Sequence, residues 1–376
     1  MYLSEIIGQD LVKKHMISRL ENDQVPHAQL IIDKNGYGGL PLALGHALLL
    51  CYSQADLKAK QEDEVSSVKL LQHSDIHFVF PVIKSKSQGA KTSSKDFIGP
   101  WYNFLEAQPY GNYANWFLQI DAGNKQGVIS VYEMKLLQEK THLKSLSGGN
   151  KVCIIWGAEK MNASAANKFL KLLEEPPEKT FFILVAEDDS SLLETIISRC
   201  QKIDLKPVSR NDCMVYLERK GITDASLLDT SQGSLRVLTE LLKSENTNNF
   251  EFILVEGLRA AFRAKGNKNS VIDLMKWAEK MKSLDKEQQK SFLLYAVHFF
   301  RSAFFLNYHL EELVHFKSES GFDLNKLAPY IHAKNFVPLK TVFENAHHYL
   351  SQNANPQILF TNLALETTRL LNAPSR

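Results

Sequence analysis

The feature that most constrains the fold is an alternation of short apolar segments and helical patterns in the first 205 residues. The apolar segments are continuous, which is typical of strands covered on both faces. They lie at 29–33, 75–82, 151–156, 181–186 and 201–205, and helical patterns lie between them at 40–51, 131–143, 163–174 and 190–198. Strands that alternate with helices predict an α/β domain with a mostly parallel sheet.

The helix expected over 163–174 has the clearest boundaries. Asn162 can accept hydrogen bonds from its first turn, and apolar residues recur at helical spacing behind it. Pro176 and Pro177 end it, because proline lacks an amide donor and clashes with the preceding turn.

Two other regions depart from the alternating pattern. Residues 84–127 read as an insertion rich in aromatic residues, which cover either this domain's own sheet or a neighbouring chain. After residue 205 only helical patterns remain, at 209–220, 234–243, 250–265, 271–281, 286–308, 339–350 and 356–371. The order of the chain is therefore α/β first and all-helical afterwards.

Composition excludes several classes of protein. Charged residues make up 23% of the 376 residues and the formal net charge is only +2, which gives no sign of strong autonomous DNA binding. No apolar run approaches the roughly 20 residues needed to cross a bilayer, and the first ten residues lack a secretion signal. The four cysteines show no CxxC spacing. We therefore expect a cytoplasmic protein without zinc.

A glycine-rich turn joins the first predicted strand to the first predicted helix. A phosphate-binding loop in this position reads Gly, four residues, Gly, Lys and then Ser or Thr. Here Gly36 and Gly38 remain, but Gly39 stands at the lysine position and Leu40 at the hydroxyl position. The turn by itself fits a degenerate phosphate loop and an ordinary strand-to-helix turn equally well.

Motifs on both sides of this turn favour the first interpretation. They are Ile-Ile-Gly-Gln-Asp at 6–10, Pro-His-Ala-Gln-Leu at 26–30, Asn-Lys-Phe-Leu-Lys-Leu-Leu-Glu-Glu-Pro-Pro at 167–177 and Ser-Arg-Cys at 198–200. In this order and spacing they resemble the clamp-loader branch of the AAA+ ATPases, over residues 1–80 and 128–240. The resemblance implies an AAA+ type P-loop domain at 1–206, a small helical lid domain at 207–246 and an all-helical collar domain for oligomerisation at 247–376.

The family's other nucleotide-contacting positions are also altered. The two magnesium-binding acids correspond to Trp156 and Gly157, and Glu159 is read as a surface or helix-start acid. The sensor of the terminal phosphate, a Thr or Asn in the family, falls near Ala186 or Glu187, and neither of these is a neutral hydrogen-bond donor. Arg236 resembles the arginine of the second sensor, although it also fits a solvated helix arginine. The resemblance thus implies no ATP hydrolysis and no cofactor, with weak nucleotide binding left open.

One catalytic element of the family is retained. In Ser198-Arg199-Cys200 the family's arginine reaches in trans into the ATP site of a neighbouring subunit, and the alternative is an ion pair within its own domain. The resemblance implies an inactive clamp-loader subunit of the DNA polymerase III holoenzyme. Its partners would be gamma/tau-like motor subunits and a delta-like subunit, the sliding clamp indirectly, and primer–template DNA without sequence preference, with no membrane contact. The alternatives are an active motor subunit and an interaction protein of this fold outside replication.

Overall fold

The computed structural model describes residues 2–84, 89–123, 125–222, 226–243, 247–264, 270–311, 314, 318, 321–351 and 354–372. The chain divides into two compact units. The first comprises Met1–Tyr216 with Gly233–Arg236, and the second comprises Leu217–Gln232 with Val237–Arg376. The predicted division at residues 206 and 246 into three domains stays a prediction.

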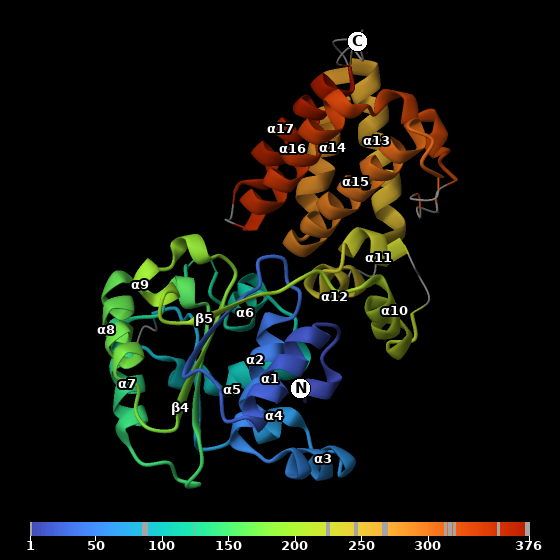
Figure 1. Cartoon of the computed structure of the whole chain (residues 1–376). Coiled ribbons are helices and arrows are strands. Elements are labelled where there is room, and N and C mark those ends of the chain that lie inside the picture. Colours follow the sequence, from blue (N-terminus) through green and yellow to red (C-terminus); the bar gives the residue numbers. More distant parts are fainter. Residues whose placement is uncertain are drawn as a thin grey trace. The chain divides into compact units, whose positions relative to one another are not determined.

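A five-stranded parallel sheet forms the centre of the first unit (Figure 1). Its strands are β1 (Ala28–Ile32), β2 (Ile76–Val79), β3 (Lys151–Trp156), β4 (Thr180–Ala186) and β5 (Gln201–Asp204), in the order β2-β3-β4-β1-β5. All neighbouring strands pair in parallel, and Leu30 of β1 lies opposite Leu184 of β4. The predicted α/β fold with a parallel sheet is confirmed.

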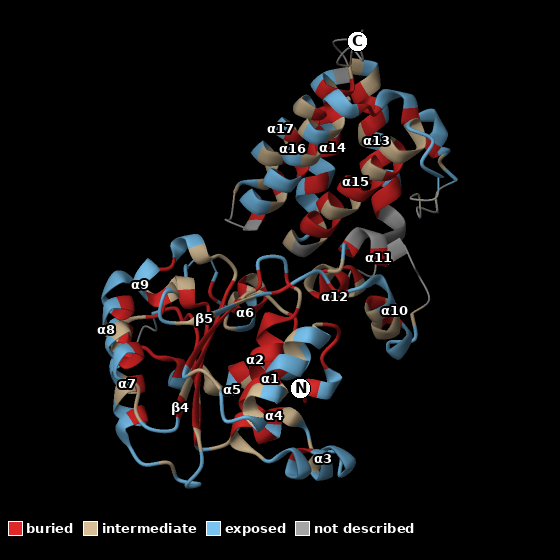
Figure 2. Ribbon diagram, viewed as in Figure 1, coloured by how far each residue is buried: buried red, intermediate tan, exposed pale blue. Residues whose placement is uncertain are grey.

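Helices cover both faces of this sheet, so β1 to β4 are largely buried, whereas the edge strand β5 is only partly covered (Figure 2). In β3, Val152 and Ile154 belong to a core shared with α1 (Asp10–Glu21) and α2 (Gly39–Cys51). Cys153 and Ile155 face the opposite core, shared with α7 (Val131–His142), α8 (Ala163–Glu174) and α9 (Glu194–Ile197). Two smaller helices follow α2, namely α3 (Gln54–Glu62) and α4 (Ser67–Leu70).

The predicted insertion contains α5 (Ile98–Ala107) and α6 (Tyr113–Gln119), preceded by two 3-10 turns, Gly89–Lys91 and Ser94–Phe97. Its tryptophans, Trp101 and Trp116, are fully buried. The ring of Trp101 stacks on Phe80 at 4.2 Å between centroids, and Trp116 contacts the same ring edge-on at 5.0 Å. The insertion therefore covers its own sheet, which is the first of the two alternatives.

Two predicted elements are shorter than the sequence suggested. The strand expected over 75–82 ends at Val79, because Phe80 exchanges hydrogen bonds with the hydroxyl of Ser94 in the insertion and not with a neighbouring strand. The helix expected over 190–198 is only the short α9, preceded by a 3-10 turn at Asp189–Ser191.

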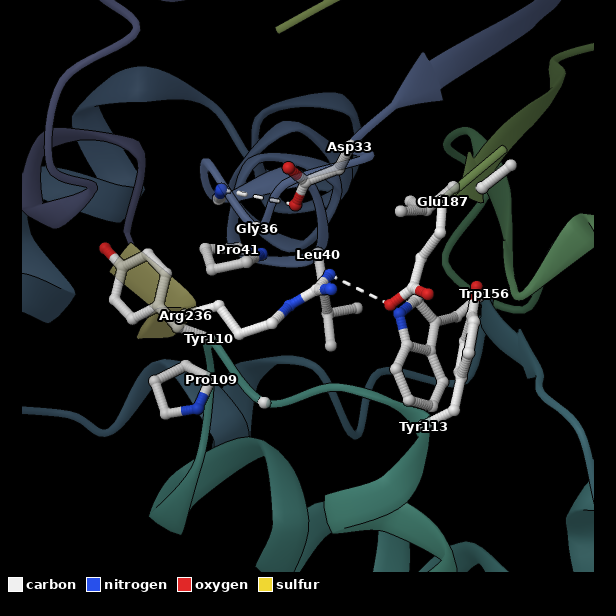
Figure 3. A pocket seen from close by; sticks show the side chains of 14 residues that line it. Asp33, Gly36, Leu40, Pro41, Pro109, Tyr110, Tyr113, Trp156, Glu187 and Arg236 are labelled. Carbon is white, nitrogen blue, oxygen red and sulfur yellow. Dashed lines mark hydrogen bonds and ion pairs between the residues drawn. The ribbon is translucent and has the colours of Figure 1, made fainter. Parts of the chain in front are cut away.

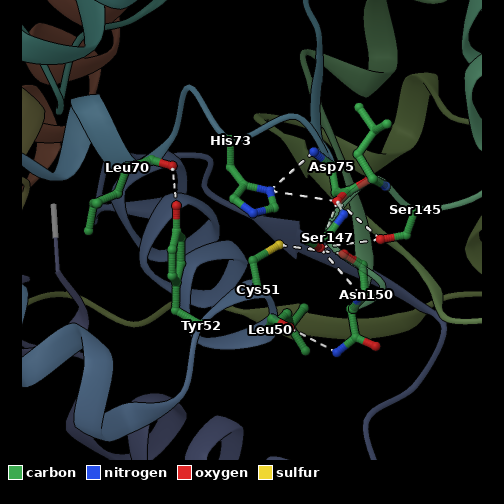
Figure 4. A network of polar contacts seen from close by, with 11 residues as sticks. Leu50, Cys51, Tyr52, Leu70, His73, Asp75, Ser145, Ser147 and Asn150 are labelled. Carbon is green, nitrogen blue, oxygen red and sulfur yellow. Dashed lines mark hydrogen bonds and ion pairs between the residues drawn. The ribbon is translucent and has the colours of Figure 1, made fainter.

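A polar network around Asp75 lies at the end of the sheet where the strands β2 and β3 begin (Figure 4). The Asp75 carboxylate accepts hydrogen bonds from the backbone of Leu146 and Ser147 at 3.0 Å, and from the hydroxyls of Ser145 and Ser147. Burial acts to raise the pKa of Asp75, but these hydrogen bonds outweigh it and lower the pKa to about 2. The network ties the loop before β3 to the start of β2, at the end of the sheet opposite to the glycine-rich turn.

The second unit is helical, as predicted. It includes α11 (Ser226–Ser231), α13 (Thr247–Ala264), α14 (Ser270–Ser283), α15 (Lys286–Asn307), α16 (Ala333–Ser351) and α17 (Pro356–Leu371). The helices α10 (Arg210–Arg219) and α12 (Leu235–Lys243) each contribute to both units. The helix α16 begins six residues before the predicted start and contains Pro338 within it. Among the described residues, no helix combines the length and the apolar character that crossing a membrane requires.

Candidate functional site

The candidate site lies at the carboxyl ends of β1, β3 and β4, where the glycine-rich turn leads into α2 (Figure 3). Gly36 and Gly38 have backbone φ angles of +76° and +108°, which residues with side chains rarely adopt. The predicted retention of these glycines therefore has a conformational reason. The turn keeps the backbone of a loop that can direct N–H groups toward an anion.

The anion in this loop is the chain's own Asp33. Its carboxylate accepts hydrogen bonds from the backbone N–H groups of Tyr37, Gly38 and Gly39, at 3.3 Å for Gly38 and 2.7 Å for Gly39. Asp33 is only 7% exposed. Sequence reasoning missed this residue, although the phosphate-loop pattern already places its first glycine at position 33.

Arg236 covers the loop from the other side. Its guanidinium forms an ion pair with Glu187 at 2.9 Å, and its backbone N–H donates to the carbonyl of Gly36 at 3.1 Å. A Cβ atom added at Gly36 would lie 2.3 Å from the Cβ of Arg236, so the two residues pack closely. The predicted second-sensor arginine is thus paired with the acidic residue at the position of the other sensor, and it is not a solvated helix arginine.

Aromatic side chains lie where the resemblance predicts the family's magnesium-binding acids. Trp156 is 4% exposed, and its ring lies 4.7 Å from Tyr113 and 5.1 Å from Trp101, centroid to centroid. Gly157 follows with a φ of +77° and turns the chain away from the sheet. A tryptophan offers no oxygen to Mg²⁺, which prefers oxygen ligands.

Glu159 starts a short 3-10 helix, as expected, but its carboxylate is not on the surface. It accepts hydrogen bonds from the hydroxyl of Tyr113 at 2.8 Å and from the backbone N–H of Glu187 at 3.3 Å. Burial raises the pKa of Glu159, and the hydrogen bond from Tyr113 opposes that shift. Of the two interpretations, a surface acid and a helix-start acid, the second agrees with the structure.

Little space remains among these residues. The remaining lining comes from Leu40 and Pro41 of the loop and from the insertion residues Pro109, Tyr110 and Gly111. The volume that the centre of a water molecule can reach is about 10 Å³, which is enough for one water. Ligand pockets usually have some 300–1,000 Å³. In this conformation the site has no room for a nucleotide.

The metal-binding potential of the described residues is small. No three or more His, Cys, Asp or Glu side chains among them are arranged to hold a metal ion. All four cysteines are described and none is in a disulfide. Burial raises the pKa of Cys200 to about 12, so this thiol stays protonated at neutral pH.

Arg199 lies apart from the glycine-rich loop, after α9 and before β5. Its guanidinium forms an ion pair with Glu174 at 2.7 Å and donates a hydrogen bond to the carbonyl of Thr195 at 3.0 Å. The side chains of Arg199 and Glu174 are 37% and 49% exposed. The flanking Ser198 also bonds to the Thr195 carbonyl, and Cys200 packs against the core. Arg199 thus makes an ion pair within its own unit and remains accessible from outside.

Comparison with known protein families shows which family the chain belongs to. The model of the family described as "DNA polymerase III, delta subunit" matches residues 8–209, which is more than half of the chain. The chain belongs to this family. Several relatives are named as the delta' subunit of DNA polymerase III, so the predicted resemblance to the clamp-loader family is confirmed and the chain is delta-prime-like.

Three relatives illustrate the similarity. The delta' subunit of DNA polymerase III from Haemophilus influenzae is 36% identical over 96 residues, which is 26% of this chain and 29% of the relative. That of Yersinia pestis is 31% identical over 174 residues, covering 44% and 49%. The tau subunit of Bacillus subtilis is 33% identical over 121 residues, covering 32% and 21%. Each match spans less than half of the relative's length.

Proposed function

We propose that this chain is a delta-prime type subunit of a DNA polymerase III clamp loader that does not hydrolyse ATP itself. In this proposal it contributes Arg199 to the ATP site of a neighbouring motor subunit. The observation that carries the proposal is the closed nucleotide site. Enzymatic phosphoryl transfer depends on positioning and on neutralising phosphate charge, and the residues that do both in the family are replaced here.

The loss of function is supported position by position. Gly39 cannot offset phosphate charge, and Leu40 cannot bind magnesium. Trp156 fills the space where a metal ion and the attacking water would lie. Arg236, which could contact a phosphate, is already paired with Glu187. These changes act together, so we expect no turnover and not merely slow turnover.

The role of Arg199 is supported by its exposure and its chemistry. An exposed ion pair contributes only about 0.2–1 kcal/mol, so exchanging Glu174 for a phosphate oxygen costs little. Arginine stays charged, and its planar fork matches two phosphate oxygens. The side chain is held by Glu174 and the Thr195 carbonyl at one side and is open to a neighbouring subunit at the other.

The wider assembly follows from the same proposal. The second, helical unit acts as the collar that joins this chain to gamma/tau-like motor subunits and a delta-like subunit. The complex opens a sliding clamp and places it on primer–template DNA. Any contact of this chain with DNA goes to phosphates without sequence preference. The near-neutral net charge predicts that such a contact is weak for the isolated chain. The work takes place in the cytoplasm, without zinc or another cofactor in this chain.

Reconstitution with the motor and delta-like subunits of the same cell tests the proposal. We expect Arg199→Ala to leave assembly intact and to lower ATP hydrolysis at the neighbouring site by about 10³-fold, the lower end of the range for arginines supplied in trans. Arg219→Ala removes an exposed arginine at the end of α10 and serves as the matched control. Unchanged hydrolysis with Arg199→Ala would refute the role in trans.

The similarity to a tau subunit keeps one alternative, an active motor subunit, in view. The isolated chain decides between the two, because a motor subunit hydrolyses ATP on its own. Measurable ATP hydrolysis by the purified wild-type chain would favour the motor subunit. An interaction protein outside replication would fail to co-purify with the clamp-loader subunits.

A further inference from the structure

The glycine-rich loop keeps one property of a phosphate loop, namely a set of backbone N–H groups that converge on an anion. In phosphate loops such groups, at the start of a helix, bind the phosphates of a nucleotide. Here the groups of Tyr37, Gly38 and Gly39 bind the Asp33 carboxylate. The negative charge also suits the positive end of the dipole of α2.

Gly39 is matched to this arrangement. A Cβ atom added at Gly39 would lie 2.7 Å from the Cβ of Asp33 and 3.0 Å from its Oδ2. The nearest of these atoms is at the root of the Asp33 side chain, so a change of its outer torsion alone does not relieve the clash. A lysine at position 39 is therefore incompatible with Asp33 in its present place. The missing lysine and the added carboxylate are two parts of one change.

We infer that Asp33 is an internal substitute for phosphate: its carboxylate fills the anion site of the loop, and Gly39 is the residue that leaves room for it. The loop is then held in its ordered form without any nucleotide. This inference rests on the proposed function in one respect, the identification of residues 33–40 as a former phosphate loop. It adds the ligand of that loop, which is a carboxylate of the same chain.

A double-mutant cycle on the full-length chain tests the pairing. We expect Gly39→Ala to lower the midpoint of urea unfolding, because of the clash with Asp33. In the Asp33→Gly background the same change should be tolerated, so that the double variant is no less stable than Asp33→Gly. Gly149→Ala is the control, because Gly149 is exposed, its φ lies outside the left-handed region, and a Cβ there would meet only the Ser147 hydroxyl, at 3.4 Å.

Two outcomes of the cycle overturn the inference. The first is that the effects of Gly39→Ala and Asp33→Gly add. The second is that Gly39→Ala is tolerated as well as Gly149→Ala, and this outcome decides the matter even where Asp33→Gly does not fold. Asp33→Asn keeps the Cβ atom that causes the clash, so Gly39→Ala should cost as much in this background as in the wild type.

Chemical rescue tests the anion site directly. Inorganic phosphate should raise the melting temperature of Asp33→Gly in a saturable way, relative to chloride at the same ionic strength. It should leave the wild type and Asp204→Gly unchanged. Asp204 is an exposed carboxylate at the carboxyl end of β5, the end of the sheet at which the loop also lies. Its removal changes the net charge by the same amount as Asp33→Gly and removes no group that binds the loop. Absence of rescue in a folded Asp33→Gly variant would overturn the inference.

The two proposals fail separately. Additive effects and no rescue would remove the role of Asp33 and leave the assignment of Arg199 untouched. ATP hydrolysis by the wild-type chain would remove the proposed function, whatever the Asp33 variants show.

Discussion

Two arginine–glutamate pairs in the first unit have the same chemistry and different surroundings. Arg236 and Glu187 meet at 2.9 Å with side chains 17% and 32% exposed. Arg199 and Glu174 meet at 2.7 Å with side chains 37% and 49% exposed. The first pair is fixed further by the hydrogen bond from the Arg236 backbone N–H to the carbonyl of Gly36. In the second pair, Arg199 donates its further hydrogen bond to the carbonyl of Thr195, only four residues before it.

The comparison teaches that burial, and not residue type, separates a structural arginine from an available one. The resemblance to clamp loaders predicts that both arginines stand at phosphate-contacting positions. Arg236 is enclosed by the loop and the insertion and is engaged with its own chain. Arg199 has one backbone hydrogen bond and an exposed ion pair, which solvent screens and which a stronger anion can displace.

The rings of Trp101, Phe104, Tyr113, Trp116 and Trp156 pack together beside the candidate site and are called the aromatic wall below. Truncating Trp156 is the strongest test of the contrast between the enclosed Arg236 and the accessible Arg199. Trp156→Ala should lower the free energy of unfolding by about 3–5 kcal/mol, because it leaves a cavity beside Trp101, Phe104 and Tyr113. Urea unfolding measures the effect, and Leu146→Ala, at an 82% exposed position, should stay within about 0.5 kcal/mol of the wild type. A small effect of Trp156→Ala would mean that the closure of the candidate site does not depend on the aromatic wall.

The contrast is tested further by a contact that depends on pH. This contact holds the insertion, which lines the site of Arg236, and it does not involve Arg199. Glu133 is 6% exposed and accepts a hydrogen bond from the backbone N–H of Ser94 at 2.6 Å. Burial raises the pKa of Glu133 from 4.5 to about 7, against the opposing effect of the Ser94 hydrogen bond. Between these two values the folded chain binds more protons than the unfolded chain, so stability falls as pH rises, by roughly 3 kcal/mol in all.

Glu133→Gln should abolish that loss, because the amide does not ionise and still offers an oxygen to Ser94. The measurement is urea unfolding at several values between pH 4.5 and 8. Glu139→Gln, on the exposed face of the same helix, is the control and should keep the wild-type slope. A slope in Glu133→Gln equal to that of the wild type would assign the pH dependence to other groups.

The smallest expected effect compares the two arginines directly. Arg236→Ala should cost about 1–3 kcal/mol, because it leaves the half-buried Glu187 without this partner and removes packing against Gly36. Arg199→Ala should change the free energy of unfolding by less than about 0.5 kcal/mol. Thermal unfolding of both variants provides the measurement. Equal costs for the two would erase the distinction between a structural and an available arginine.

The sequence predicted the fold well where local signals are strong. The helix at 163–174 was predicted with the bounds that α8 has, because the Asn162 cap and the proline pair mark its two ends. The strand at 75–82 was predicted too long, because its end depends on Ser94, a residue 14 positions from Phe80. Local patterns do not contain such contacts.

The candidate site was predicted in part for the same reason. The losses at Gly39, Leu40 and Trp156 are visible in the sequence, because they are changes of residue type at fixed positions. What replaces the lost groups is not visible. Asp33 was overlooked since the motif records which residues are missing and not which new side chain binds the backbone, and the pairing of Arg236 with Glu187 joins residues far apart in the chain.

The aromatic wall has an optical consequence. Three of the four tryptophans belong to it, with Trp101 lying 5.2 Å from Trp116 and 5.1 Å from Trp156 between ring centroids, while Trp277 belongs to the second unit. Ultraviolet emission from the chain is therefore weighted toward one corner of the first unit. In a Trp277→Phe variant, the remaining tryptophan fluorescence reports on the aromatic wall alone. It can show, without an added label, whether the candidate site stays closed when clamp-loader subunits are added.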